Sequence, residues 1–184
     1  ALVMDVKCGK GAFMKNRADA KTLAEMIVRV GTLNGLKVEA VITSMEAPLG
    51  RDVGNMLEVI ESIEKLQGKG PKDIEELSVV LTAGMVRLAG KAPTNAAAEK
   101  LVREALASGA ALEKFKQMVA AQGGDPKIVE NFTLMPTAPD RATVVADSSG
   151  FIGGMDAEAV GVAAMHLGAG KHVVAPVLPL AGAQ

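Results

Sequence analysis

The sequence contains no tryptophan and no tyrosine, and phenylalanine occurs only four times in 184 residues. Proteins that bind single-stranded nucleic acid stack the bases on aromatic side chains and attract the phosphates with a basic surface. This chain has few such rings, and its formal net charge is −1 at pH 7. The composition therefore argues against a nucleic-acid partner.

Cysteine and long apolar segments are also scarce. The single cysteine, Cys8, excludes an intrachain disulfide and is typical of a reducing compartment, so we expect a cytoplasmic protein. No apolar run approaches the roughly 20 residues that a membrane-spanning helix needs, which argues against a membrane partner. Neither a secretory signal pattern nor a Ser-His-Asp, HExxH or CxxC motif is present, so the residues by themselves identify no catalytic group.

Hydrophobic spacing predicts an α/β fold. The apolar run that leads into Asp5 and a β-branched run at 38–43 indicate two parallel strands joined by a helix at 17–34. Further helices are expected at 54–67, 71–89, 94–108, 110–121, near 126–131 and at 156–167, and further strands at 142–147 and 150–153. Pro136 and Pro139 mark a linker. We therefore predict part of a mixed or parallel sheet domain covered by helices over 1–135, and the start of a small α+β C-terminal subdomain over 136–184.

The end of the first predicted strand carries the clearest candidate residues. Asp5 and Lys7 lie two apart on that strand and so face the same side, where they either form a structural ion pair or hold a substrate. Phe13 follows in a loop spaced by Gly9 and Gly11, where it either anchors the loop under the next helix or contacts a ligand. The two glycines alone are too weak a pattern for a phosphate-binding loop, because the third glycine and the P-loop Lys-Ser/Thr are absent.

A second candidate is the segment from Pro48 to Glu61. Carbonyl oxygens of a loop shaped by proline and glycine, together with a carboxylate from the next helix, can form an oxygen-only site for a hard cation. From the residues alone, Glu58 and Glu61 are equally well explained as solvent-facing charges on a helix. The pattern therefore leaves both interpretations open.

Three segments, in this order, resemble one family of enzymes. They are DVKCGKGAFM at 5–14, ITSMEAPLGRDVGNMLEVIE at 42–61 and GFIGGMDAEAVGVAAMHLGAG at 150–170. Together they are similar to the pyrimidine-nucleoside phosphorylases, the thymidine phosphorylase family, and the similarity runs from residue 1 to about residue 170. Members of that family are more than twice as long, so we expect this chain to be an internal to C-terminal portion. Its tail at 171–184 departs from the family pattern.

The resemblance implies an activity, a set of partners and several site residues. Such enzymes cleave thymidine or uridine with phosphate as co-substrate, and they are homodimers. The resemblance places Phe13 beside the pyrimidine ring, and Asp5 and Lys7 close to the nucleoside. It also implies a potassium ion held by Leu49, Asp52 and Glu61. The family's phosphate-binding and base-binding groups have no counterpart in this sequence, so no catalytic residue is assigned and we expect the chain alone to be inactive.

Two other interpretations remain open. The first is a non-catalytic scaffold or accessory protein, which the absence of the family's catalytic residues favours. The second is a related enzyme of the same fold group, such as an AMP phosphorylase or a phosphoribosyltransferase. The GAFM segment and the PLG…GN.LEV pattern favour the nucleoside enzymes over this second alternative.

Overall fold

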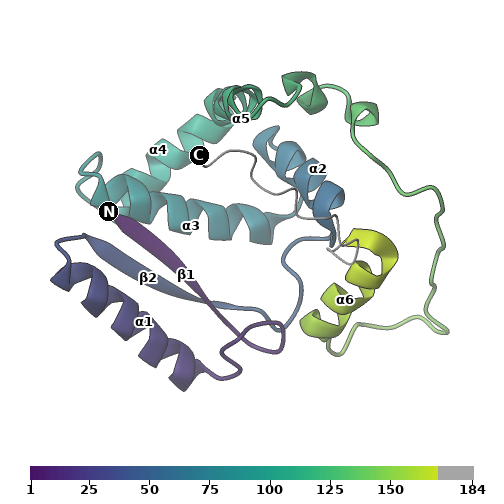
Figure 1. The fold of residues 1–184 in the computed structure, drawn as a ribbon, viewed down its shortest axis with the longest axis horizontal. Coiled ribbons are helices and arrows are strands. Elements are labelled where there is room, and N and C mark those ends of the chain that lie inside the picture. Colours follow the sequence, from purple (N-terminus) through teal and green to yellow (C-terminus); the bar gives the residue numbers. More distant parts are fainter. Residues whose placement is uncertain (170–184) are drawn as a thin grey trace, which may run out of the picture.

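The computed structural model describes residues 1–169, and its centre is a two-stranded parallel sheet (Figure 1). Strand β1 (Leu2–Cys8) pairs with β2 (Val38–Ser44), with Leu2 opposite Val38 and Cys8 opposite Ser44. Helix α1 (Arg17–Leu33) connects the two strands. Because a parallel pair needs such a crossover, the predicted β-α-β unit and the α/β fold class are confirmed.

Helices cover both faces of this sheet. Helix α1 lies on one face, where Val6 of β1 is buried against Ala20 and Ala24. Helix α3 (Lys72–Leu88) lies on the other, where a Cβ added to Gly84 would come within 3.3 Å of the Val3 side chain (Figure 1). Successive side chains of a strand alternate between its faces. The odd-numbered residues of β1, including the two candidate residues that follow Val3, therefore point to the α3 side.

The remaining helices match the predicted positions closely. They are α2 (Asn55–Leu66), α4 (Asn95–Ala107), α5 (Ala110–Ala121) and the short 3-10 helices η1 (Pro126–Val129) and η2 (Phe132–Leu134). Ile63, Val129 and Met135 form a second buried cluster, which fastens η1 and η2 to α2. Helices therefore form where apolar residues recur at helical spacing and a capping residue precedes them, as Thr94 does by accepting from the Ala97 amide.

The strands expected at 142–147 and 150–153 are not formed, and this prediction was wrong. Residues 135–156 contain neither helix nor strand, and Val144 and Phe151 are almost fully exposed. A β-branched run becomes a strand only where another strand pairs with it, and the sheet of residues 1–169 contains β1 and β2 alone. The predicted domain boundary remains a prediction, and residues 170–184 of the second predicted domain lie outside the described residues.

The chain resumes regular structure at α6 (Ala157–Ala164), which continues into the π-helical turn η3 (Met165–Ala169). The Asp156 side chain caps α6 by accepting from the Ala159 amide at 3.0 Å. This confirms the helix expected at 156–167. No helix within residues 1–169 is long and apolar enough to cross a membrane.

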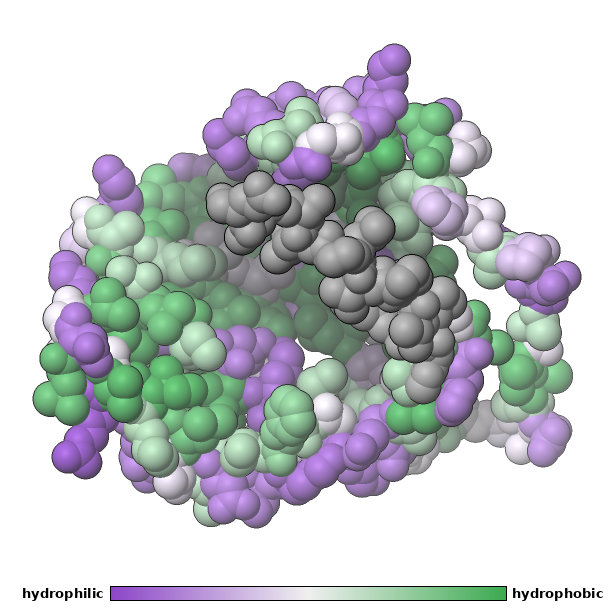
Figure 2. All heavy atoms as spheres, viewed as in Figure 1, coloured by the Kyte–Doolittle hydropathy of each residue, from purple (hydrophilic) through white to green (hydrophobic). Residues whose placement is uncertain are grey.

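The outer face of α1 is unusually apolar. Met26, Val30 and Leu33 are more than half exposed and recur at helical spacing, so they form one stripe. Figure 2 shows apolar side chains gathered over this part of the molecule. Within residues 1–169, no other element covers this stripe.

Candidate functional site

The loop after β1, residues 9–15, is closed by hydrogen bonds at the carboxyl end of the sheet. The Gly9 amide donates to the Met14 carbonyl at 3.0 Å, and the Lys15 ammonium donates to the Lys10 carbonyl at 2.6 Å. Gly9 has a φ of 133°, and a Cβ there would lie 2.9 Å from the backbone of Glu46. Only glycine fits this position, so the sequence fixes the course of the loop.

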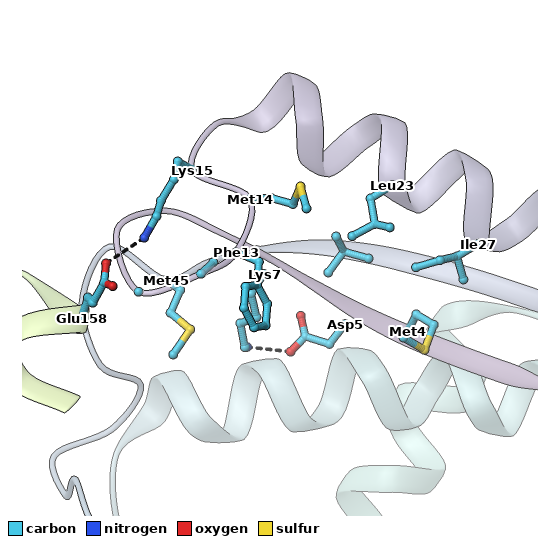
Figure 3. A pocket seen from close by; sticks show the side chains of 13 residues that line it. Met4, Asp5, Lys7, Phe13, Met14, Lys15, Leu23, Ile27, Met45 and Glu158 are labelled. Atoms are coloured by element: carbon cyan, nitrogen blue, oxygen red, sulfur yellow. Dashed lines mark hydrogen bonds and ion pairs between the residues drawn. The ribbon is translucent and has the colours of Figure 1, made fainter. Parts of the chain in front are cut away.

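Phe13 lies at the tip of this loop, and the residue is 99% exposed. It lines a pocket of about 570 Å³ together with Met14, Met45 and residues of β1 and α1 (Figure 3). A residue that anchored the loop would be packed under α1, and Phe13 is not. Its exposed ring is therefore free to pack against a planar ligand.

Asp5, Lys7 and Thr43 form a polar group beside the pocket. The Lys7 ammonium donates to Asp5 Oδ2 at 2.6 Å and to Thr43 Oγ1 at 3.3 Å, and the Thr43 hydroxyl donates to Asp5 Oδ1 at 2.5 Å. The ion pair is partly buried, with 33% of the Lys7 side chain and 22% of the Asp5 side chain exposed. Nothing in the local sequence marks Thr43 as a site residue. The parallel register, which places it opposite Lys7, is what brings it into the group.

The pocket extends along the free edge of β1. Within residues 1–169, β2 is the only strand that pairs with β1, and Cys8 also forms an isolated bridge with Met14, so before Cys8 alternate backbone groups on the other edge of β1 have no strand partner. Met4 and Val6, on the α1 face, and Asp5 and Lys7, on the α3 face, all line the pocket. The pocket thus wraps around this edge, and only its end near Phe13 and Lys7 lies outside the carboxyl ends of the strands, where ligands bind in open α/β sheets.

The loop before α2 encloses Glu61. This residue is 4% exposed, and its carboxylate accepts from the amides of Arg51 at 2.9 Å and Asp52 at 3.4 Å. The interpretation of Glu61 as a solvent-facing charge was therefore wrong, because the loop folds back over α2. Glu58, three residues earlier on α2, accepts instead from the Gly54 amide at 3.0 Å.

Negative charge accumulates in this loop. Burial, followed by repulsion from the Glu61 and Glu64 carboxylates, raises the pKa of Asp52 above its ordinary value of 3.8. Within residues 1–169, no lysine or arginine forms an ion pair with Glu61. A buried carboxylate without a cationic partner is costly, so a bound cation suits the chemistry of this loop.

The described residues limit which ligands such a cation can have. Residues 1–169 contain no group of three or more His, Cys, Asp or Glu side chains placed to hold a metal ion. Leu49, in the same loop, has no side-chain ligand to offer and is 43% exposed. A cation at Glu61 would therefore need backbone oxygens, which favours a hard ion over a transition metal.

Comparison with known proteins supports one family. Residues 1–112 match the family described as "Glycosyl transferase family, a/b domain". The chain is 46% identical over 172 residues to a pyrimidine-nucleoside phosphorylase of Staphylococcus haemolyticus (strain JCSC1435), which covers 94% of this chain and 40% of that protein. A pyrimidine-nucleoside phosphorylase of Staphylococcus aureus (strain USA300) is 46% identical over 171 residues, or 93% of this chain and 40% of that protein.

The α/β unit with its two loops at one end of the sheet thus defines a glycosyltransferase-type domain. The identity to the two staphylococcal enzymes narrows this class, and the chain belongs to the pyrimidine-nucleoside phosphorylase family. It spans about 40% of the length of the relatives that it matches.

Proposed function

We propose that this chain forms the base-side wall and the cation loop of a pyrimidine-nucleoside phosphorylase. The enzyme would cleave thymidine or uridine with phosphate, giving the free base and (deoxy)ribose-1-phosphate. The observation that carries this proposal is the exposed ring of Phe13 in a pocket at the carboxyl end of β1. The names of the staphylococcal relatives support the choice of substrate class.

In this reaction a phosphate oxygen forms a bond to C1′ of the sugar while the bond from C1′ to the base nitrogen breaks. The electron pair of the broken bond leaves with the base, so donors near the base stabilise the transition state. Phe13 would hold the pyrimidine by ring packing, a contact worth about 1 kcal/mol. Asp5 and Thr43 would fix the Lys7 ammonium, and with it the polarity of this side of the pocket.

The second loop would hold a potassium ion. Its proposed ligands are the carbonyl oxygens of Leu49 and Asp52 and the carboxylate of Glu61. Bound there, the ion would neutralise the buried Glu61 and offset the carboxylate repulsion that, after burial, raises the pKa of Asp52. Its role would be to stiffen the loop, since none of its proposed ligands lines the pocket beside Phe13.

The phosphate-binding motifs that the family resemblance implies do not occur in this sequence. We therefore propose that the phosphate site and the groups that grip the base belong to sequence matching the remaining part of the relatives, and that this chain alone does not turn over substrate. The active form would be a cytoplasmic homodimer, as the family resemblance and the single cysteine suggest.

Phosphorolysis of thymidine and uridine tests the proposal directly. The chain would be assayed alone and mixed with the part of the Staphylococcus aureus relative that it does not match. We expect base release, followed by liquid chromatography, only in the mixture. Turnover by the chain alone would contradict the proposed division of the site. No turnover in either case, with a folded chain by circular dichroism, would favour a scaffold role.

A Phe13→Ala variant in the active mixture tests the pocket itself. We expect the nucleoside KM to rise about fivefold, which corresponds to the ring contact of about 1 kcal/mol, with the phosphate KM unchanged. Phe151→Ala is the matched control, because Phe151 is equally exposed but lies outside the pocket. An equal rise in both KM values for the Phe13 variant would contradict a role in base packing.

A further inference from the structure

Helix α6 touches the loop that carries Phe13, although the two are far apart in the sequence. The Lys15 ammonium and the Glu158 carboxylate lie 2.8 Å apart across a separation of 143 residues (Figure 3). Next to this pair, a Cβ added to Gly11 would lie 2.8 Å from the Ala157 Cβ. The start of α6 is therefore in tight contact with the loop, both through an ion pair and through van der Waals packing.

The other end of the same segment touches the loop around Glu61. A Cβ added to Gly54 would lie 2.9 Å from the Ala169 Cβ, at the end of η3. Gly54 is the N-cap of α2, the helix that carries Glu61, and it closes the loop that donates amides to this carboxylate. Thus α6 and η3 together span the distance between the two loops at the carboxyl end of the sheet (Figure 1).

The sequence neighbours of α6 do not explain its position. Residues 135–156, which precede it, contain no helix or strand and are largely exposed. Ala157, by contrast, is only 7% exposed, because it is packed against the loop after β1. The contacts with the two loops are therefore what place α6 within the described residues.

We propose that α6 and η3 form a bridge that fixes the Phe13 loop and the Glu61 loop relative to each other, and that Lys15 and Glu158 are positioning residues for Phe13. The functional consequence of this bridge, which is to place the base beside Phe13, rests on the proposed function. Lys15 suits the role because its ammonium donates both to Glu158 and to the Lys10 carbonyl inside the loop. The Lys15 side chain therefore stabilises both the closed loop and the contact between this loop and α6.

The expected effect of breaking the ion pair is small but measurable. Both side chains are more than half exposed, with 57% for Lys15 and 64% for Glu158, so solvent screens the pair. Exposed pairs typically change a local equilibrium between about 1.4-fold and 5-fold. The packing of Gly11 against Ala157 has no such screening, and a methyl group at Gly11 should separate bridge and loop more strongly.

Amide hydrogen exchange on the full chain tests the bridge without any substrate. For Glu158→Gln we expect the amides of Gly9, Gly11 and Ala12 to exchange about threefold faster, and those of Arg51 and Asp52 to speed up as well. Glu158→Asp, which keeps the carboxylate and leaves the Lys15 hydrogen bond to the Lys10 carbonyl in place, should accelerate exchange in the two loops less than Glu158→Gln does. Acceleration of the first loop alone, or equal acceleration by Glu158→Asp and Glu158→Gln, would overturn the bridge.

Matched controls separate the bridge from general destabilisation. Glu104→Gln breaks the similarly exposed Lys100–Glu104 pair on α4 and should leave both loops unchanged. Gly11→Ala should accelerate exchange in both loops, whereas Gly150→Ala, with no atom within 4 Å of the added Cβ, should accelerate neither. Equal effects of Gly11→Ala and Gly150→Ala would contradict the packing contact.

The functional consequence is read in the active mixture. Glu158→Gln should raise the nucleoside KM about threefold with the phosphate KM unchanged, and Glu158→Asp, which keeps the carboxylate, should raise it less. Without phosphorolysis by any variant, the proposed function fails, while hydrogen exchange still decides whether the bridge exists. With phosphorolysis and an unchanged nucleoside KM, the proposed function stands and the positioning role is refuted.

Discussion

Replacing Gly50 by alanine tests whether the second loop is built around the buried Glu61. Gly50 has a φ of 74°, and an added Cβ would lie 2.4 Å from Glu61 Oε2 and 2.5 Å from Ile74 Cδ1. A carboxylate at the end of a long side chain can usually move aside. Here the carboxylate cannot move without losing the hydrogen bonds that it accepts from the Arg51 and Asp52 amides.

Gly35→Ala is the control, because it imposes the same backbone strain without the steric clash. Gly35 has a φ of 73°, and an added Cβ would meet nothing within 4 Å. The left-handed conformation alone costs an alanine about 1–2 kcal/mol, so this is the expected loss for the control. Gly50→Ala should lose about 2 kcal/mol more, because overpacking costs about 1–3 kcal/mol and a hydrogen bond to a charged group is worth about 1.5–3 kcal/mol.

Urea unfolding followed by far-ultraviolet circular dichroism measures this difference, since the chain has no tryptophan or tyrosine to serve as a fluorescent probe. With a slope of about 2 kcal/mol per molar urea, the midpoint of Gly50→Ala should lie about 1 M below that of Gly35→Ala. Equal midpoints for the two variants would refute the close contact between the loop and the Glu61 carboxylate.

Three further substitutions follow from the charges and hydrogen bonds. Asp52→Asn should stabilise the chain by less than about 1 kcal/mol at pH 7, because the raised pKa of Asp52 means that ionisation opposes folding. This gain should vanish below pH 3.8, where the carboxyl is protonated in both the folded and the unfolded state, and a gain that persists there would contradict this cause. Lys65→Met should cost about 1 kcal/mol of folding free energy at pH 7, because the Lys65 hydrogen bond and charge lower the pKa of Glu75 from its ordinary 4.5. That stabilisation exists above pH 4.5 and is lost as the pH falls through the lowered pKa, so the urea midpoints of variant and wild type should converge in acid. A difference in midpoint that stays constant with pH would contradict this cause. Thr43→Val should lower the free energy of unfolding by about 1 kcal/mol, because it removes the hydroxyl that lies between the two charged residues of β1. Thr43→Ser keeps the hydroxyl and should lose much less stability, so equal losses for the two variants would contradict the hydrogen bonds.

Most of the local structure was predictable because its causes lie close together in the sequence. The helices at 17–33 and 55–66 follow from apolar residues at helical spacing, and the β-α-β unit follows from two apolar runs around the first helix. The strands expected at 142–147 and 150–153 did not form for the complementary reason. Val144 and Phe151 belong to runs with strand-like composition, but a strand also needs a partner, and composition does not reveal one.

The candidate site also has features that the local sequence predicts and features that only the tertiary structure decides. The sequence alone placed Phe13 in a glycine loop and put Asp5 and Lys7 on one face of a strand, because strand alternation and glycine conformations are local properties. Three other features depend on how distant segments meet. They are the burial of Glu61, the hydrogen bond from Thr43 to Asp5 across 38 residues, and the ion pair between Lys15 and Glu158 across 143 residues. Nothing in the local sequence encodes such a meeting, since it is decided by which apolar faces pack together when the whole chain collapses.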